Sequence, residues 1–198
     1  DLETTGATAT ADRITEIGIV EVDADGAVRE WQQLVNPGTR IPPFIEQLTG
    51  ISNAMVADAP PFEAVAPEVL RRLEGRLFVA HNARFDYGFL KNEFKRLGVS
   101  FRAPVLCTVK LSRALFPEHK RHNLDSLIER HGLAADARHR ALADARLIHQ
   151  FWQRVNTAPG AAAVEAAVRQ QNARPSLPAY LDAGIVDGAV LGVAHGTD

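Results

Sequence analysis

In the first part of the chain, short runs that contain apolar and β-branched residues are separated by turn residues, a pattern typical of β-strands. Residues 14–23 are rich in β-branched side chains and read as one strand, and residues 28–35 read as a second. The sequence Asp-Ala-Asp-Gly between them is typical of a hairpin turn. Residues 1–3 also suit a strand. These three segments predict a three-stranded antiparallel meander.

Further along, short apolar runs alternate with segments of helical period. Residues 77–80 are wholly apolar, as in strands buried on both faces of a parallel sheet, and residues 104–107 suit a similar strand. Asn82 is expected to cap the helix that follows the first of these strands. The pattern predicts an α/β fold, with a mixed central sheet flanked by helices. The expected helices are 62–73, 83–97, 124–131, about 140–155 and 161–171.

The composition indicates one folded domain with an appendage. The 198 residues are 46% apolar, which is enough for a sizeable core. We assign residues 1–155 to the α/β domain and 156–174 to a helical extension, whose Ala-rich helix is expected to bury little. Residues 175–198 are rich in Gly, Ala and Pro and are interpreted as a tail or linker.

The charge and the cysteine content narrow the functional classes. A net charge of −2 argues against a broad basic surface for nucleic acid, so a polyanionic substrate would need local basic groups or metal ions. No apolar run has the length of a membrane span, and no signal-peptide pattern opens the chain. Cys107 is the one cysteine, which favours a reducing cytoplasmic location.

Four carboxylates stand out as candidate metal ligands. Asp1 and Glu3 are two residues apart, so on a strand they project from the same face and repel each other unless a cation or a proton intervenes. Asp86 lies in the first turns of a helix that leaves a buried strand, a usual location for sites in open sheets. Asp144 lies near the start of a later helix. Four carboxylates can balance two divalent hard cations.

His139 precedes Asp144 by five residues. On a continuous helix, at ~100° per residue, the two side chains would point about 140° apart. They can converge only if His139 lies in the loop before the helix. A neutral imidazole there can accept the proton of an attacking water, so His139 fits a general base.

Three segments together resemble a known family. Asp1-Leu-Glu-Thr-Thr-Gly6, His81-Asn-Ala-Arg-Phe-Asp86 and His139-Arg-Ala-Leu-Ala-Asp144 are similar to the three motifs of the DEDDh (DnaQ-like) 3′–5′ exonucleases, which include the proofreading epsilon subunit of bacterial DNA polymerase III. The resemblance covers roughly residues 1–155. It implies an RNase H-like fold and two Mg²⁺ or Mn²⁺ ions. It also implies that Asp1, Glu3, Asp86 and Asp144 bind metal and that His139 is the general base.

The resemblance also suggests substrate contacts. The segment from Leu48 to Ile51, with Thr49 and Gly50 at its centre, is similar to a family segment that contacts the terminal nucleotide. Thr4 and Asn82 lie beside metal ligands and are candidates for contact with the terminal sugar or base. For each of these residues a structural role in a turn, cap or core is the alternative.

The function expected from the family is a metal-dependent 3′–5′ exonuclease. It would release nucleoside monophosphates from single-stranded DNA 3′ ends during proofreading or repair. The alternatives are an RNA-trimming exoribonuclease of the same family and a non-catalytic exonuclease-like scaffold subunit. Residues 174–182 are similar to a linker that leads into UvrC-like endonuclease domains, so the expected partners are such a module or a DNA polymerase. We also expect the first strand to be truncated at its N-terminus, so that the chain as given folds poorly or is inactive.

Overall fold

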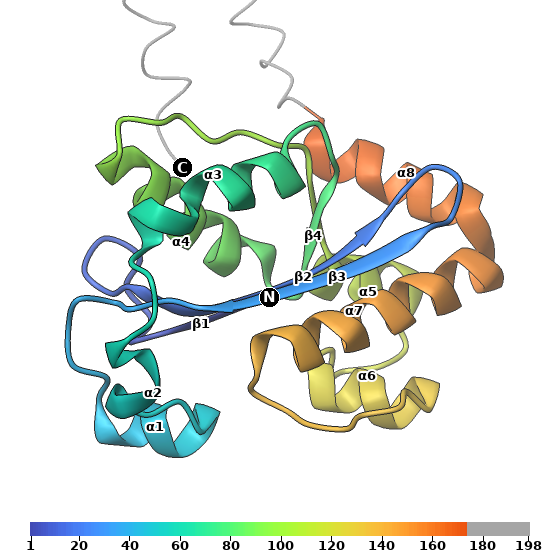
Figure 1. Ribbon diagram of the computed structural model, residues 1–198. Coiled ribbons are helices and arrows are strands. Elements are labelled where there is room, and N and C mark those ends of the chain that lie inside the picture. Colours follow the sequence, from blue (N-terminus) through green and yellow to red (C-terminus); the bar gives the residue numbers. More distant parts are fainter. Residues whose placement is uncertain (174–198) are drawn as a thin grey trace, which may run out of the picture.

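The computed structural model describes residues 1–173, and an antiparallel meander lies at its centre (Figure 1). Its strands are β1 (Leu2–Thr4), β2 (Ile14–Val22) and β3 (Val28–Leu34), in the order β1-β2-β3. This confirms the predicted meander. Glu16 on β2 lies opposite Glu3 on one side and opposite Leu34 on the other. The three side chains therefore share one face of the sheet.

Two further strands form a separate parallel pair. In β4 (Phe78–Ala80) and β5 (Val105–Cys107), Val79 lies opposite Leu106. The expected mixture of antiparallel and parallel strands is present. Within residues 1–173, however, the meander and the β4–β5 pair are not hydrogen-bonded to each other and so do not form one continuous sheet. A groove lined by residues of β2, β4 and α7 (Ala141–Val155), including Val20, Phe78 and Ile148, lies between them.

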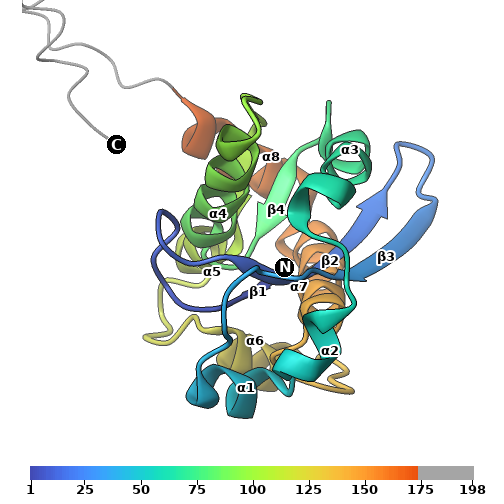
Figure 2. The same ribbon diagram turned by 60° about the vertical axis from the view of Figure 1, so that its left-hand side comes forward.

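Helices cover both faces of the meander. Figures 1 and 2 show α3 and α4 on one side and α6 and α7 on the other, with α1 and α2 beyond the end of β3. None of the helices in the described part of the chain is long and apolar enough to cross a bilayer. The remaining helices are α1 (Pro43–Thr49), α2 (Asn53–Ala57), α3 (Phe62–Leu73), α4 (Ala83–Arg96), α5 (Thr108–Leu115), α6 (Leu124–His131) and α8 (Ala161–Asn172); a kinked segment, η1 (Asn156–Gly160), joins α7 to α8.

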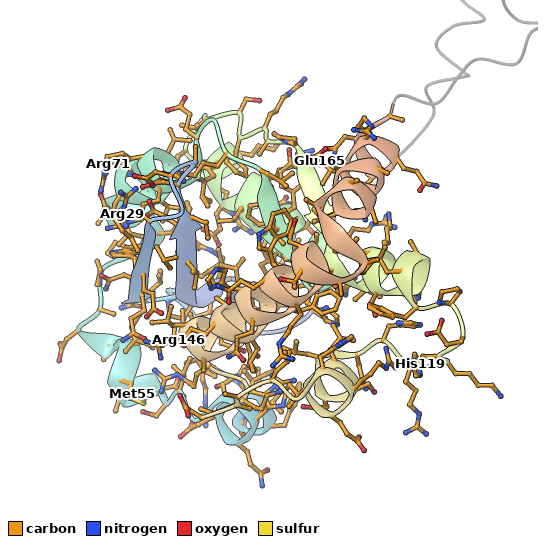
Figure 3. All side chains as sticks on the ribbon, turned by 90° about the vertical axis from the view of Figure 1, so that its right-hand side faces the viewer. Arg29, Met55, Arg71, His119, Arg146 and Glu165 are labelled. Carbon is orange, nitrogen blue, oxygen red and sulfur yellow. The ribbon has the colours of Figure 1, made fainter. Side chains whose placement is uncertain are left out.

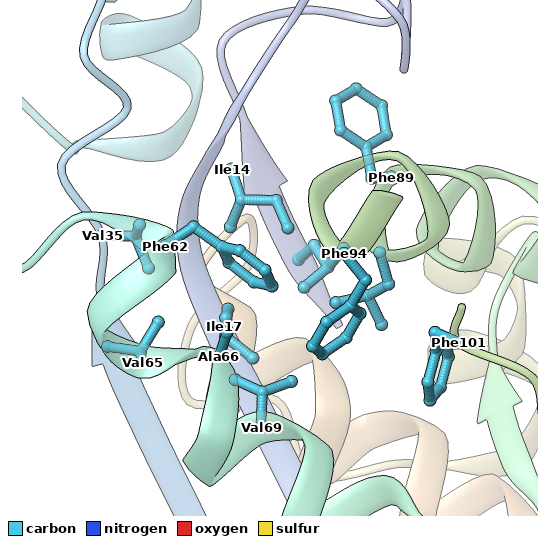
Figure 4. Close-up of a cluster of buried hydrophobic side chains, with 12 residues drawn as sticks. Ile14, Ile17, Val35, Phe62, Val65, Ala66, Val69, Phe89, Phe94 and Phe101 are labelled. Atoms are coloured by element: carbon cyan, nitrogen blue, oxygen red, sulfur yellow. The ribbon is translucent and has the colours of Figure 1, made fainter. Parts of the chain in front are cut away.

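The larger hydrophobic core lies between the meander, α3 and α4 (Figure 4). Ile14 and Ile17 enter it from β2, and Val69 enters from α3. Phe62 and Phe94 meet edge to face, with 5.2 Å between their ring centroids. This core holds α4, and with it Asp86, against the face of the meander that α3 also covers.

The second core involves α8, against the expectation that this helix buries little. Val164 and Ala167 are buried in a cluster with residues of α5, α6 and α7. The side-chain amides of Gln171 and Asn172 each donate to and accept from the backbone of β5, at Cys107 and Val105. The expectation was wrong because Val164 and Ala167 share one face of α8 and pack into this cluster, whereas Ala161, Ala162 and Ala166 are exposed. The tail assigned to residues 175–198 lies outside the described residues.

Candidate functional site

Three carboxylates converge at the end of β1. One oxygen from each of Asp1, Glu3 and Asp144 lies within 4.8 Å of the other two. Asp1 and Glu3 share a face of β1, as the two-residue spacing predicted. Asp144 reaches the same point from the first turn of α7. Residues from opposite ends of the domain, Asp1 and Glu3 on one side and Asp144 on the other, thus form one acidic cluster.

Asp86 lies beside this cluster but is not within the 4.8 Å group. It is buried in the first turn of α4, where its Oδ1 accepts a hydrogen bond of 3.1 Å from the backbone N–H of Leu2. Burial, with a smaller contribution from the nearby Asp144, raises the pKa of Asp86 to about 6, although the amino group of Asp1 and the Leu2 hydrogen bond both act to lower it. Asp86 therefore joins α4 to the strand that carries Asp1 and Glu3.

The cluster suits a divalent cation by its chemistry. Burial raises the pKa of Glu3 to about 8, and the carboxylates of Asp144, Glu16 and Asp86 contribute to the shift. Such crowding is unfavourable for the ionised forms and is relieved when a cation shares their oxygens. All the donors are carboxylate oxygens, the ligands that Mg²⁺ and Mn²⁺ prefer. The residues present fit the metals that the family implies.

His139 lies in the loop before α7, as predicted. Its backbone is left-handed, with φ of 60°, and the helix begins two residues later at Ala141. The His139 N–H points to Asp144 Oδ1 at 3.3 Å, and the side chain is half-buried. The left-handed turn is what brings His139 back toward Asp144 despite their five-residue separation.

Arg138 is a further residue of the site that the sequence pattern did not single out. Its Nη1 donates to Asp144 Oδ1 at 2.6 Å, and its Nε donates to Asp125 Oδ1 at 2.8 Å. Asp144 Oδ1 thus receives hydrogen bonds from both Arg138 and His139. In the sequence, only its position next to His139 could have indicated that Arg138 belongs to the site. Its hydrogen bond to Asp125 has no counterpart in the sequence pattern.

The backbone contact between α7 and β2 fixes the position of Asp144. Gly18 lies on β2 directly beneath the start of α7, and a Cβ at this position would lie 2.2 Å from the backbone nitrogen of Leu142. A larger residue would push the helix outward. Gly18 is therefore required for the close approach of α7 to the sheet.

Three of the residues predicted to contact the substrate also stabilise the turns and helix ends in which they lie. The hydroxyl of Thr4 donates to the carbonyl of Gly6, and that of Thr49 donates to Ile45 and accepts from Ile51. Gly50 is the left-handed C-cap of α1.

Asn82 occupies the N-cap position of α4, but its φ is 65° and its side chain makes no capping hydrogen bond. The expectation of a side-chain cap was wrong, because Asn82 adopts a left-handed conformation instead of the extended backbone of a usual N-cap. Its exposed amide is consequently not engaged in capping.

The chain is similar in sequence to known exonucleases. The exonuclease family model RNase_T matches residues 1–151. The 3′-5′ exonuclease DinG of Bacillus subtilis is 45% identical over 151 residues, covering 74% of this chain and 16% of that protein. The PolC-type DNA polymerase III of Caldanaerobacter subterraneus is 42% identical over 146 residues, covering 74% of this chain and 10% of that protein.

A third relative is a putative bifunctional exonuclease/endonuclease protein of Mycobacterium tuberculosis. It is 40% identical over 168 residues, covering 78% of this chain and 26% of that protein. The chain thus spans between a tenth and about a quarter of the length of these three relatives.

Solved structures share the fold. Exonuclease X, in complex with 5′ overhanging duplex DNA, aligns with a TM-score of 0.70 and 28% identity over 87% of this chain and 97% of that chain. The nuclease domain of 3′hExo, a DEDDh family member bound to rAMP, aligns with a TM-score of 0.67 and 22% identity over 80% of this chain and 90% of that chain. These alignments confirm the expected RNase H-like fold. The chain therefore belongs to the RNase_T exonuclease family.

Proposed function

We propose that the chain is a metal-dependent 3′–5′ exonuclease that releases nucleoside monophosphates from single-stranded DNA 3′ ends, in proofreading or repair. The observation that carries the proposal is the convergence of Asp1, Glu3 and Asp144 within 4.8 Å, with Asp86 bonded to the same strand. A cluster of two half-buried carboxylates and one buried carboxylate is unfavourable in itself, so its presence supports a cation-dependent role.

In this proposal Asp1, Glu3, Asp86 and Asp144 hold two Mg²⁺ or Mn²⁺ ions. The bound ions would supply charge stabilisation for the attacking water and for the leaving oxygen of the phosphodiester. His139 accepts the proton of that water, and the hydrogen bonds of Asp144 to Arg138 and His139 orient this carboxylate. Thr4, Thr49, Gly50 and Asn82 are proposed to lie near the terminal nucleotide.

We favour DNA as the substrate because one relative in sequence is a DNA polymerase and because Exonuclease X was solved with DNA. RNA trimming is the second candidate, because 3′hExo was solved with rAMP. The two candidates share the carboxylate cluster, so only the 2′-hydroxyl separates them.

The relatives also suggest associated modules. The PolC-type relative supports a polymerase as a partner, and the bifunctional relative supports a second nuclease module. The linker assigned to residues 174–182 lies outside the described residues. A cytoplasmic location is part of the proposal and is supported by the cysteine content.

Matched DNA and RNA oligonucleotides labelled at the 5′ end test the proposal, with Mg²⁺, Mn²⁺ or EDTA. We expect a ladder of DNA products shortened from the 3′ end, loss of activity in EDTA, and loss in Asp144→Asn. Asp136→Asn, which alters an exposed acid in the same loop, is the control and should retain activity. Equal cleavage by Asp144→Asn and the wild type would reject the enzyme assignment and leave the scaffold role. Faster cleavage of RNA would favour the second candidate.

A further inference from the structure

Glu16 is a buried acid on β2 that does not belong to the carboxylate cluster of Asp1, Glu3 and Asp144. Its side chain is 3% exposed, and both of its oxygens are engaged. Arg140 donates to it twice, from Nε to Oε1 at 2.9 Å and from Nη2 to Oε2 at 2.6 Å. The backbone N–H of Ala141 donates to Oε1 at 2.9 Å. Three donors from one short segment therefore converge on a single carboxylate.

The location of Glu16 connects the separate parts of the site. Its backbone lies opposite Glu3, a carboxylate of the acidic cluster. Its partner Arg140 directly follows His139, and its other partner, Ala141, is the first residue of α7, three residues before Asp144. Glu16 thus contacts the chain on the C-terminal side of His139 while its own strand pairs with β1.

These contacts have a clear physical effect on the His139 loop. The N–H of Ala141 is one of the donors that a helix start leaves without an intrahelical partner, and a carboxylate there also interacts favourably with the helix dipole. His139 itself has a left-handed backbone, which is unfavourable for a residue with a Cβ and persists only when its surroundings hold it. Arg138 anchors the loop before His139, and the Arg140–Glu16 pair anchors it afterwards.

We propose that Glu16, acting through Arg140, is a positioning residue that fixes the His139 loop against the carboxylate cluster. This inference rests on the proposed role of His139 as the general base. It assigns to Glu16 a role in the reaction step, beyond a contribution to stability. A general base has to lie within hydrogen-bond reach of its water, and a displacement of about 1 Å can lower the rate about 100-fold.

Glu16→Gln is the first test, because glutamine keeps the shape of the side chain but replaces one acceptor oxygen with an amide that repels the Arg140 donors. We expect kcat to fall about 10- to 100-fold with little change in the KM for the oligonucleotide or in Mn²⁺ affinity by calorimetry. Arg140→Lys, which keeps the charge but loses the bidentate geometry, should produce the same pattern.

The ion pair of Arg146 with Glu30 is a matched control. It also joins α7 to the meander, with Arg146 Nε 2.9 Å from Glu30 Oε2, but it lies on the exposed surface two residues beyond Asp144 (Figure 3). Glu30→Gln should leave kcat and KM unchanged. A loss of kcat in Glu30→Gln as large as that in Glu16→Gln would mean that any loosening of α7 suffices, and would overturn the proposal.

A double-mutant cycle with His139→Ala separates positioning from a general structural effect. If Glu16 acts through His139, adding Glu16→Gln to His139→Ala should cause no further loss of kcat. Losses that multiply would overturn the proposal. A loss of Mn²⁺ affinity in Glu16→Gln large enough to explain its lower kcat would also overturn the proposal.

A readout without activity distinguishes this inference from the proposed function. In spectra of the histidine rings, the His139 resonance should be single in the wild type, shifted or broadened in Glu16→Gln and Arg140→Lys, and unchanged in Glu30→Gln. An unchanged His139 resonance in Glu16→Gln would reject the positioning role. Full activity of His139→Ala, by contrast, would reject the general base and leave the structural result standing.

Discussion

The backbone N–H of Leu2 donates a hydrogen bond of 3.1 Å to the buried Oδ1 of Asp86, which is 84 residues away in sequence. This bond attaches α4 to β1 between the two carboxylates of that strand. It gives Asp86 a structural role as an acceptor in addition to its proposed role as a metal ligand. A substitution of Asp86 that removes the negative charge but keeps the acceptor oxygen can therefore distinguish the two roles.

Asp86→Asn should abolish activity without destabilising the metal-free protein. Asparagine can still accept from Leu2, whereas the buried negative charge, which the raised pKa of Asp86 marks as unfavourable, is lost. Asp86→Ala should lower the stability by about 1–3 kcal/mol, because the Leu2 N–H is left buried without its partner. Thermal melts in EDTA and exonuclease assays of both variants check this. A lower Tm for the asparagine variant than for the alanine variant would contradict it.

The metal-free protein should lose stability as the pH rises. Burial raises the folded-state pKa of Glu3 from 4.5 to about 8, so between these values the folded state binds more protons than the unfolded state. The contribution of Glu3 is fully present below about pH 4.5 and is lost as the pH rises through 8. Melts in EDTA across this range should show the fall, and Glu3→Gln should flatten it.

Mn²⁺ should stabilise the protein more at pH 8 than at pH 5.5. Metal ligands have to be deprotonated, and at the lower pH a proton competes for Glu3. The increase in Tm on adding Mn²⁺ is the measurement. An increase that is equal at the two pH values, or larger at pH 5.5, would contradict the assignment of Glu3 as a ligand.

Gly18→Ala should destabilise the protein and reduce activity together. The added methyl would lie 2.2 Å from the backbone nitrogen of Leu142, so α7 has to move away from β2 and carry Asp144 with it. Overpacking of this kind costs about 1–3 kcal/mol. Gly88→Ala is the control, since its Cβ would meet only Ala9 at 3.9 Å, and in the interior of α4 it should stabilise by up to about 1 kcal/mol. Denaturant unfolding of both variants gives the comparison.

Gln171→Ala should destabilise the protein by uncovering part of the edge of β5 that α8 covers. The Gln171 amide pairs with both the N–H and the carbonyl of Cys107, in the way that a neighbouring strand would. Loss of two such hydrogen bonds should cost about 1–3 kcal/mol and leave an unpaired strand edge open to self-association. Unfolding and sedimentation measurements test this, with the exposed neighbour Gln170→Ala as the control. Identical behaviour of the two variants would contradict the role of Gln171.

Residues that are neighbours in the chain were sufficient to predict most of the local elements and to nominate the candidate residues of the site. The β-branched residues of 14–23 and the turn sequence that follows them predicted β2 and β3, because such side chains favour strands and such a turn joins two of them. The five-residue spacing of His139 and Asp144 required His139 to precede the helix, because helical geometry excludes the alternative. Both inferences depend on neighbours in the chain, for which periodicity carries the information.

The hydrogen bonds between residues that are distant in sequence could be identified only from the three-dimensional packing. The bonds of Asp86 to Leu2, of Arg138 to Asp125 and of Glu16 to Arg140 join segments whose separation in sequence has no fixed relation to their distance in space. The docking of α8 and the separate pairing of β4 with β5 likewise depend on shape and on strand register. Local periodicity reports which face of an element is buried, whereas packing decides what that face is buried against.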